Sequence, residues 1–412
     1  MNPYSLAILI ALFIRFILFM TATFLNIINI IQSKYEDIKQ NYSYAEYSKA
    51  CLYTQAKSKA ALIRNFLSTA LLMLFWLLSG FSYLDKFVRN ISNSDVLNGT
   101  LFIAILMAMV LSVRTVYSGY LTFVTEQKFG FNSATLKVWI HDQIKSIAIY
   151  YAIALPIIVF VLTLFSIYGA NTWWIAWILI SIASIIVEMI VPKLSLRLFY
   201  ETKSITNPQL KAKILAYCET INYPVNDIYI VDGSKRTTKV NAYFIGFGKT
   251  KAIVLFDTIL DNFTDDEILA IIGHEAGHFK LKHNIYNSIF GIAFAGSVLF
   301  LFHIFIADFR LFSAFFVYKF SYYAGITFFT ILYSVADIIV SPIMKYYLRK
   351  IEEQADIFSA QTTENKTAMI SALKKLSIKN LINPLPHPIY VMLYRSSYSI
   401  EQRIATIEKL KS

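Results

Sequence analysis

The chain has 412 residues, of which 57% are hydrophobic and only 16% charged, and its mean hydropathy is +0.54. Soluble domains are about a quarter charged, so this composition excludes an ordinary soluble enzyme, and the two cysteines exclude a disulfide scaffold. The net charge of +12 fits the lysine- and arginine-rich face of a membrane protein, and no nucleic-acid partner is expected.

A helix that crosses a bilayer needs about 20 mostly apolar residues. Seven stretches meet this requirement, at about 4–31, 66–85, 100–124, 146–169, 172–192, 285–307 and 321–343. The first stretch lacks a basic start and is too long for the apolar core of a signal peptide, so we expect it to be a retained span.

The loops 32–65 and 125–145 are richer in lysine and arginine than the loops on the opposite side. The positive-inside rule therefore places the polar segments 193–284 and 344–412 in the cytosol. We expect a multi-pass protein of a bacterial inner membrane or the endoplasmic reticulum. Its expected segments are 1–192 with five spans, 193–284 with strands, 285–343 with two spans, and 344–412.

The polar segment 193–284 has the pattern of a small α+β unit. Short β-branched and aromatic runs predict strands at 227–232 and 251–256, with a third candidate at 240–246. Thr264 and Glu267 then have the spacing of a capping box, flanked by a hydrophobic pair, Phe263 and Ile268. A helix should therefore begin near Asp265 and run past Lys280.

This helix contains His274-Glu275-Ala276-Gly277-His278. Histidines four residues apart share one helix face, so both imidazoles can bind a single ion. Zinc favours neutral nitrogen ligands and, in a catalytic site, leaves a position for water. Glu275 could take a proton from that water and return it to a leaving amine. The pattern favours a catalytic site with one Zn²⁺ ion over a pair of packed histidines.

A third ligand must come from elsewhere in the chain. Glu352 and Asp356 follow the last span and are also four residues apart. One carboxylate could bind the metal while the other orients a ligand histidine, although such pairs are often only a solvated helix face. The chain crosses the membrane twice between His278 and Glu352, so the two lie on the same side.

Four stretches resemble, in the same order, those of the CAAX prenyl protease 1 (Ste24-type) membrane metallopeptidases of the M48 type. They are residues 234–244, 254–258, 274–280 with His283, and 352–356. The resemblance implies a mainly α protein whose roughly seven transmembrane helices enclose a chamber, with a small α+β zincin-like catalytic domain. It implies a zinc metalloendopeptidase that acts on protein or peptide substrates, CaaX-type or prenylated C-termini among them.

The same resemblance assigns roles to individual residues. It implies that His274, His278 and Glu352 bind the metal, that Glu275 is the general base and that Asp356 lies behind the ligands. Asn241 and Ala242 would lie on an edge strand and pair with the substrate backbone, as extended peptides often do. Arg403 matches a family arginine and is expected at the substrate.

One position departs from the family pattern. The family usually carries a histidine, expected to bind the developing oxyanion, where this chain has Ser397. Loss of one oxyanion donor typically costs about 10²–10³ in turnover. Tyr394, Arg395 or Tyr398 could supply a substitute.

Several ionisable residues fall inside or near the ends of expected spans, where they face a hydrated chamber, pair with one another or extend to the membrane interface; these are Arg15, Arg114, Glu188, His303 and Asp337. His283 lies off the ligand face, which favours a structural role. Two other functions stay open. One is a zinc-stabilised chamber that binds clients with weak or no hydrolysis, which the loss of the family histidine would favour. The other is a transporter, which would leave the His-Glu-x-x-His motif unexplained.

Overall fold

The computed structural model describes residues 2–33, 35–37, 39–223, 225, 227–246 and 252–410. Within these ranges seven helical stretches are long and apolar enough to cross a membrane. They are α1 (Pro3–Gln32), α2 (Tyr44–Leu77), α4 (Asp95–Tyr120) with its π-helical extension η2 (Leu121–Glu126), α5 (Leu136–Tyr168), α6 (Trp173–Phe199), α10 (His283–Phe305) and α12 (Tyr322–Thr362). The predicted fold class, a mainly α polytopic protein with a small sheet, is confirmed.

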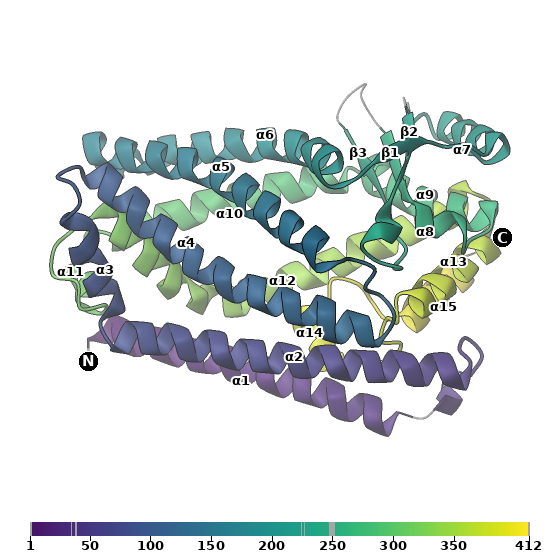
Figure 1. Ribbon diagram of the computed structural model, residues 1–412, viewed down its shortest axis with the longest axis horizontal. Coiled ribbons are helices and arrows are strands. Elements are labelled where there is room, and N and C mark those ends of the chain that lie inside the picture. Colours follow the sequence, from purple (N-terminus) through teal and green to yellow (C-terminus); the bar gives the residue numbers. More distant parts are fainter. Residues whose placement is uncertain are drawn as a thin grey trace.

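Shorter elements close the two ends of this helical bundle. α3 (Gly80–Arg89) and α11 (Phe309–Ser313) lie at one end, called the far end below (Figure 1). The other end, called the sheet end, carries α7 (Pro208–Thr220), α8 (Asp257–Leu260), α9 (Asp265–Lys280), α13 (Lys366–Lys379) and α15 (Ile400–Glu408) (Figure 1). The remaining short helices are α14 (Pro388–Tyr394) and the 3₁₀ turns η1 (Tyr35–Asp37), η3 (Ala170–Thr172) and η4 (Gly233–Lys235).

The N-terminus lies at the far end and the C-terminus at the sheet end (Figure 1). This is the arrangement that an odd number of spans produces. α10 leads away from the sheet end and α12 returns to it, so the histidine motif of α9 and the carboxylates of α12 share one end. The expected boundary at 343/344 falls inside α12, which continues as one helix to Thr362; the division of the chain into four segments stays a prediction.

Two expected helix limits were wrong. The second span was expected at 66–85, but α2 begins at Tyr44 behind a Ser43–Glu46 capping box and ends at Leu77. Ser79 then has a left-handed φ of 61°, and the chain starts α3 in a new direction. α9 was expected to run past Lys280, yet it ends there because Lys282 adopts a left-handed φ of 58° before α10 begins.

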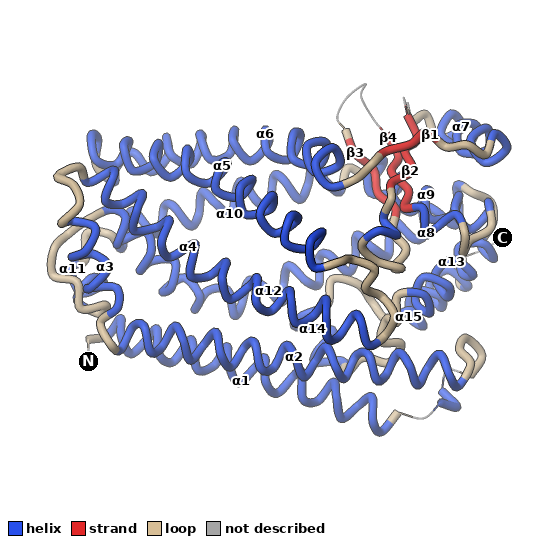
Figure 2. The backbone as a smooth tube through the Cα atoms, viewed as in Figure 1, coloured by secondary structure: helices blue, strands red, loops and turns tan. Residues whose placement is uncertain are grey.

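The sheet has four strands in the order β1-β2-β4-β3, drawn red in Figure 2: β1 (Thr202–Ser204), β2 (Asp227–Val231), β3 (Ala242–Ile245) and β4 (Ala252–Phe256). β4 is buried throughout and pairs parallel with β2 and antiparallel with β3. β3 therefore forms an edge of the sheet. The three expected strands are confirmed, although Lys251 lies outside the described residues, and the short polar strand β1 was not expected.

α9 packs closely against α12 because two glycines face that helix. A Cβ on Gly277 would lie 3.1 Å from the Ala355 Cα, and one on Gly273 would lie 2.8 Å from the Ser359 Oγ. The Ser359 hydroxyl, itself fully buried, donates a 2.6 Å hydrogen bond to the Ala270 carbonyl. The small residues thus bring the backbone of α9 near enough to α12 for their side chains to share one site.

We expect Gly277→Ala to destabilise the protein, because the added methyl meets backbone atoms of α12 that cannot move independently. Overpacking of this kind typically costs about 1–3 kcal/mol. Gly291→Ala is the matched control, since its Cβ would meet nothing within 4 Å in the middle of α10. Thermal unfolding in detergent should give a lower midpoint for Gly277→Ala alone; equal midpoints for both variants would contradict this account of the helix contact.

Candidate active site

Two imidazoles of α9 meet one carboxylate of α12. The Nε2 atoms of His274 and His278 lie 3.2 Å apart. The Glu352 carboxylate oxygens lie 3.7 Å from His274 Nε2 and 3.5 Å from His278 Nε2. A tetrahedral zinc ion bound at about 2.0–2.1 Å separates two ligand nitrogens by about 3.3 Å. The three side chains therefore have the spacing of ligands to one ion.

Asp356 fixes the outer nitrogen of His274. Its Oδ1 accepts a 2.8 Å hydrogen bond from His274 Nδ1, and the same carboxylate accepts bonds of 2.6 and 2.7 Å from Arg403. Asp356 is only 1% exposed, so this carboxylate is compensated almost entirely by those two partners. Burial alone would lower the pKa of His274, but the hydrogen bond to Asp356 and the negative charges of Asp356 and Glu352 together outweigh it, and the net pKa is raised.

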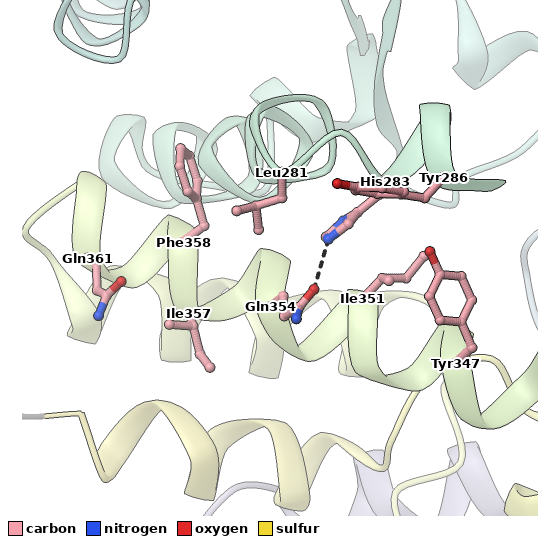
Figure 3. Close-up of a pocket in the computed structure, with 9 residues that line it drawn as sticks. All are labelled: Leu281, His283, Tyr286, Tyr347, Ile351, Gln354, Ile357, Phe358 and Gln361. Carbon is pink, nitrogen blue, oxygen red and sulfur yellow. Dashed lines mark hydrogen bonds between the residues drawn. The ribbon is translucent and has the colours of Figure 1, made fainter. Parts of the chain in front are cut away.

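His283 plays the corresponding part for His278. Its Nε2 donates to the Gln354 Oε1 at 3.0 Å, and its Nδ1 lies 3.2 Å from His278 Nδ1 (Figure 3). A neutral imidazole carries one N–H, so His283 Nδ1 is the acceptor and His278 Nδ1 the donor. Burial and the neighbouring histidines lower the pKa of His278 to about 3, which keeps this ring neutral.

When both rings are neutral, as metal binding requires, these outer contacts leave the two facing Nε2 atoms without hydrogens. His274 donates through Nδ1 to Asp356, and His278 donates through Nδ1 to His283. Two lone pairs 3.2 Å apart repel each other unless a cation lies between them. Outer contacts that fix ligand orientation in this way are characteristic of histidine metal sites. The donor set therefore fits a bound metal ion.

A small cavity of about 180 Å³ opens beside these ligands. Its lining includes His274, Glu275, Glu352 and Arg403. Burial raises the pKa of Glu275. Asn241 and Ala242, at the start of edge strand β3, also line the cavity, together with apolar residues of α13 and α15. Among the described residues, the sequence-derived site residues thus meet at one place.

The segment that leads into β3 is tied to the membrane helices, which sequence reasoning missed. Lys239 forms an ion pair of 2.8 Å with Glu126 at the end of η2, and its Nζ donates to the Tyr53 hydroxyl at 2.7 Å. Arg236 makes two hydrogen bonds, of 2.7 and 3.1 Å, to Asp142 of α5. These pairs join side chains up to 186 positions apart, and no local pattern signals them.

The C-terminal positions proposed as substitutes for the family histidine lie elsewhere. Tyr394 packs edge-on against Phe19, and Arg395 donates to the Asn383 carbonyl at 3.3 Å. Arg349 holds this segment by donating to the Val391 and Arg395 carbonyls at 2.8 and 2.9 Å. The residues lining the cavity beside the ligands do not include Tyr394, Arg395, Ser397 or Tyr398.

The charged residues within the spans have mixed surroundings. Glu188 accepts a 2.7 Å hydrogen bond from Ser288, which links α6 to α10. In the part of the chain that the structure describes, Arg15, Arg114 and Asp337 form no ion pair. Of the alternatives left open for such residues, mutual ion pairing therefore does not apply to these three.

Models of two known protein families match almost the whole chain. The CAAX prenyl protease N-terminal model, described as five membrane helices, matches residues 27–201, and Peptidase family M48 matches residues 204–411. Together they cover both the membrane helices and the residues around the candidate metal site.

Individual relatives agree with the family models. The chain is 30% identical to "Probable CAAX prenyl protease 1" of Schizosaccharomyces pombe over 385 residues, which are 88% of this chain and 79% of that protein. It is 28% identical over 308 residues to "Uncharacterized metalloprotease YhfN" of Bacillus subtilis, 74% and 72% of the two chains. The crystal structure of S. mikatae Ste24p superimposes with a TM-score of 0.93 at 26% identity, covering 99% of this chain and all of that one.

We expect Asp356→Ala to weaken metal binding about 10- to 100-fold, because His274 loses the acceptor that fixes its ring and Arg403 loses its partner. Glu353→Gln is the matched control, since this neighbouring carboxylate pairs with Lys350 instead of the histidines. Competition with a metal-sensitive dye measures the affinity. Equal affinities of the two variants would show that Asp356 does not support the ligands.

Proposed function

The chain belongs to peptidase family M48, and from that premise we propose that it is a zinc metalloendopeptidase with Glu275 as its general base. Membership of the family makes the chain a multi-pass membrane metallopeptidase. The observation that carries the finer proposal is the close approach of the Nε2 atoms of His274 and His278, 3.2 Å apart and next to the Glu352 carboxylate. Two imidazoles and one carboxylate form one of the ligand sets found in catalytic zinc sites.

His274, His278 and Glu352 would hold the ion, with Asp356 and His283 behind them. Bound there, zinc would acidify a water molecule and polarise the scissile carbonyl. Because Asp356 and His283 already fix both imidazoles, the ligands need little rearrangement to receive the metal.

Glu275 lies next to His274 in the chain and lines the same cavity. We propose that Glu275 accepts a proton from the attacking water and later donates it to the leaving amine. A purely structural metal site needs no such base and normally has no open position. The raised pKa of the buried Glu275 carboxyl, caused by its desolvation, brings it nearer to the range in which it can both accept and release a proton.

Asn241 and Ala242 would align the substrate. Strand β3 pairs with β4 along one side and forms an edge of the sheet, so its other side can accept an extended peptide. The start of that strand opens onto the cavity that holds Glu275. A peptide added there would bring its backbone alongside the metal ligands.

Arg403 lines the cavity but directs its Nε and one terminal nitrogen at Asp356. Its main role would be to fix the Asp356 carboxylate, and a contact with the substrate would use the N–H groups of the guanidinium that do not bond to Asp356.

The substrates would be proteins or peptides on the side of the membrane that carries the sheet end. The lysine and arginine distribution favours the cytosol for that side. Relatives named CAAX prenyl protease 1 support CaaX-type or prenylated C-termini as one substrate class.

The proposal is tested by cleavage of an internally quenched peptide with detergent-purified protein, beside Glu275→Gln at matched zinc content. We expect hydrolysis that is lost in Glu275→Gln, because a carboxamide cannot accept the proton, whereas zinc binding persists. A chelator should stop the wild-type reaction and zinc should restore it. If both proteins hold zinc and neither cleaves a broad peptide set, with or without a prenylated cysteine, the client-binding chamber would replace the peptidase.

We expect Ser397→Ala to keep near-wild-type turnover, because Ser397 does not line the cavity beside the ligands. Loss of a true oxyanion donor would instead cost about 10²–10³ in kcat. The quenched-peptide assay measures this directly. A loss of that size in Ser397→Ala, at unchanged zinc content, would place the serine at the reacting carbonyl.

A further inference from the structure

A second cavity lies within the membrane helices, away from the metal site. It has a volume of about 670 Å³, within the range of ligand pockets. α2 and α4 form its walls, with contributions from α3 and α12; its lining includes Leu71, Leu74, Phe75, Met109, Val110 and Ile331. The lining is almost wholly apolar, with two arginines in it, Arg64 of α2 and Arg114 of α4.

These two arginines have no carboxylate partner within the described chain. The Arg64 guanidinium lies 4.6 Å from the centre of the Tyr117 ring, and Arg114 makes neither an ion pair nor a hydrogen bond to another described residue. Both side chains are exposed in the protein alone. A charge at membrane depth is costly unless it meets water or an opposite charge, so an anionic partner would stabilise this pair.

The positions of the two arginines along their helices determine how an anionic partner would be oriented relative to the membrane. On the far-end side of Arg114, α4 carries 18 uncharged residues, Val96–Val113, which span about 27 Å. On the same side of Arg64, α2 carries 13 uncharged residues, Asn65–Leu77, about 20 Å. Since the hydrocarbon core is about 30 Å thick, both guanidinium groups lie toward its boundary at the sheet end.

An amphiphile in this cavity would therefore place its charge toward the sheet end and its tail toward the far end. A phospholipid of the leaflet at the sheet end has this orientation. Basic pockets between transmembrane helices are known to select anionic headgroups. We propose that the cavity between α2 and α4 binds one anionic phospholipid, with its phosphate on Arg64 and Arg114 and an acyl chain along the apolar lining.

The test uses native mass spectrometry of the detergent-purified full-length protein with phosphatidylglycerol or phosphatidylcholine of identical chains. Wild type should retain phosphatidylglycerol preferentially. Arg64→Gln/Arg114→Gln should lose roughly 20- to 30-fold in its affinity for that lipid, as expected for two arginines near the membrane surface. The control Lys137→Gln/Arg197→Gln removes the same charge from exposed positions outside the cavity and should keep the preference.

A second variant tests the apolar part of the cavity. Val110 is 69% exposed, so Val110→Trp can fill the cavity without disturbing the protein core. It should reduce phosphatidylglycerol binding although both arginines remain, and an unchanged thermal midpoint would show that the fold is intact.

Four results would overturn the proposal. Equal retention of the two lipids would show that the headgroup charge does not determine binding. Equal losses of phosphatidylglycerol affinity in the two double variants would show that the protein's overall positive charge, and not this pair of arginines, attracts the lipid. Unchanged binding by Val110→Trp would show that the tail lies outside the cavity. Displacement of phosphatidylglycerol by a farnesylated peptide with an amidated C-terminus would assign the cavity to substrate chains. Lipid binding requires no peptide hydrolysis, so each result can be read independently of the peptidase activity.

Discussion

Two imidazole lone pairs directed at one point repel each other, and the sheet end of the molecule is organised to hold them there. The Nδ1 atoms of His274 and His278 are engaged by Asp356 and His283, so that in the neutral rings the facing Nε2 atoms are acceptors. Glu352 adds a carboxylate from α12. A cation between these atoms would remove their repulsion, so the arrangement supports the proposed metal site.

The close approach of α9 to α12 supports that arrangement. Gly277, which lies in the same turn of α9 as His274 and His278, faces α12, and a Cβ there would lie 3.1 Å from the Ala355 Cα. Ser359, one turn beyond Asp356, donates to a carbonyl of α9, so a buried hydrogen bond adds to the packing. Glu267, near the start of α9, pairs with Lys375 and Ser371 of α13, which connects the same helix to the C-terminal segment.

Ion pairs and hydrogen bonds connect the membrane helices to the segment that lines the candidate site. Glu126 ends a π-helical stretch that continues α4 at the sheet end, and its ion pair with Lys239 holds the segment leading to β3. π-Helical turns are uncommon and frequently occur at functional places in proteins. Lys239 also donates to Tyr53, so its contacts join α2 and the end of α4 to the segment before edge strand β3.

The sequence by itself determined the features that depend on local periodicity: the seven apolar spans, three of the strands, the capped start of α9 and the histidine pair on its one face. It also brought His278 and Glu352 to the same side, because this follows from counting the spans between them. The exact ends of α2 and α9 were not predictable, since they depend on left-handed residues at Ser79 and Lys282. Only the tertiary structure decided which atoms pair across the chain: His283 with Gln354, Arg403 with Asp356 and Lys239 with Glu126. Hydrogen bonds and ion pairs of this kind join residues tens to more than a hundred positions apart, and short-range sequence patterns carry no information about such distances.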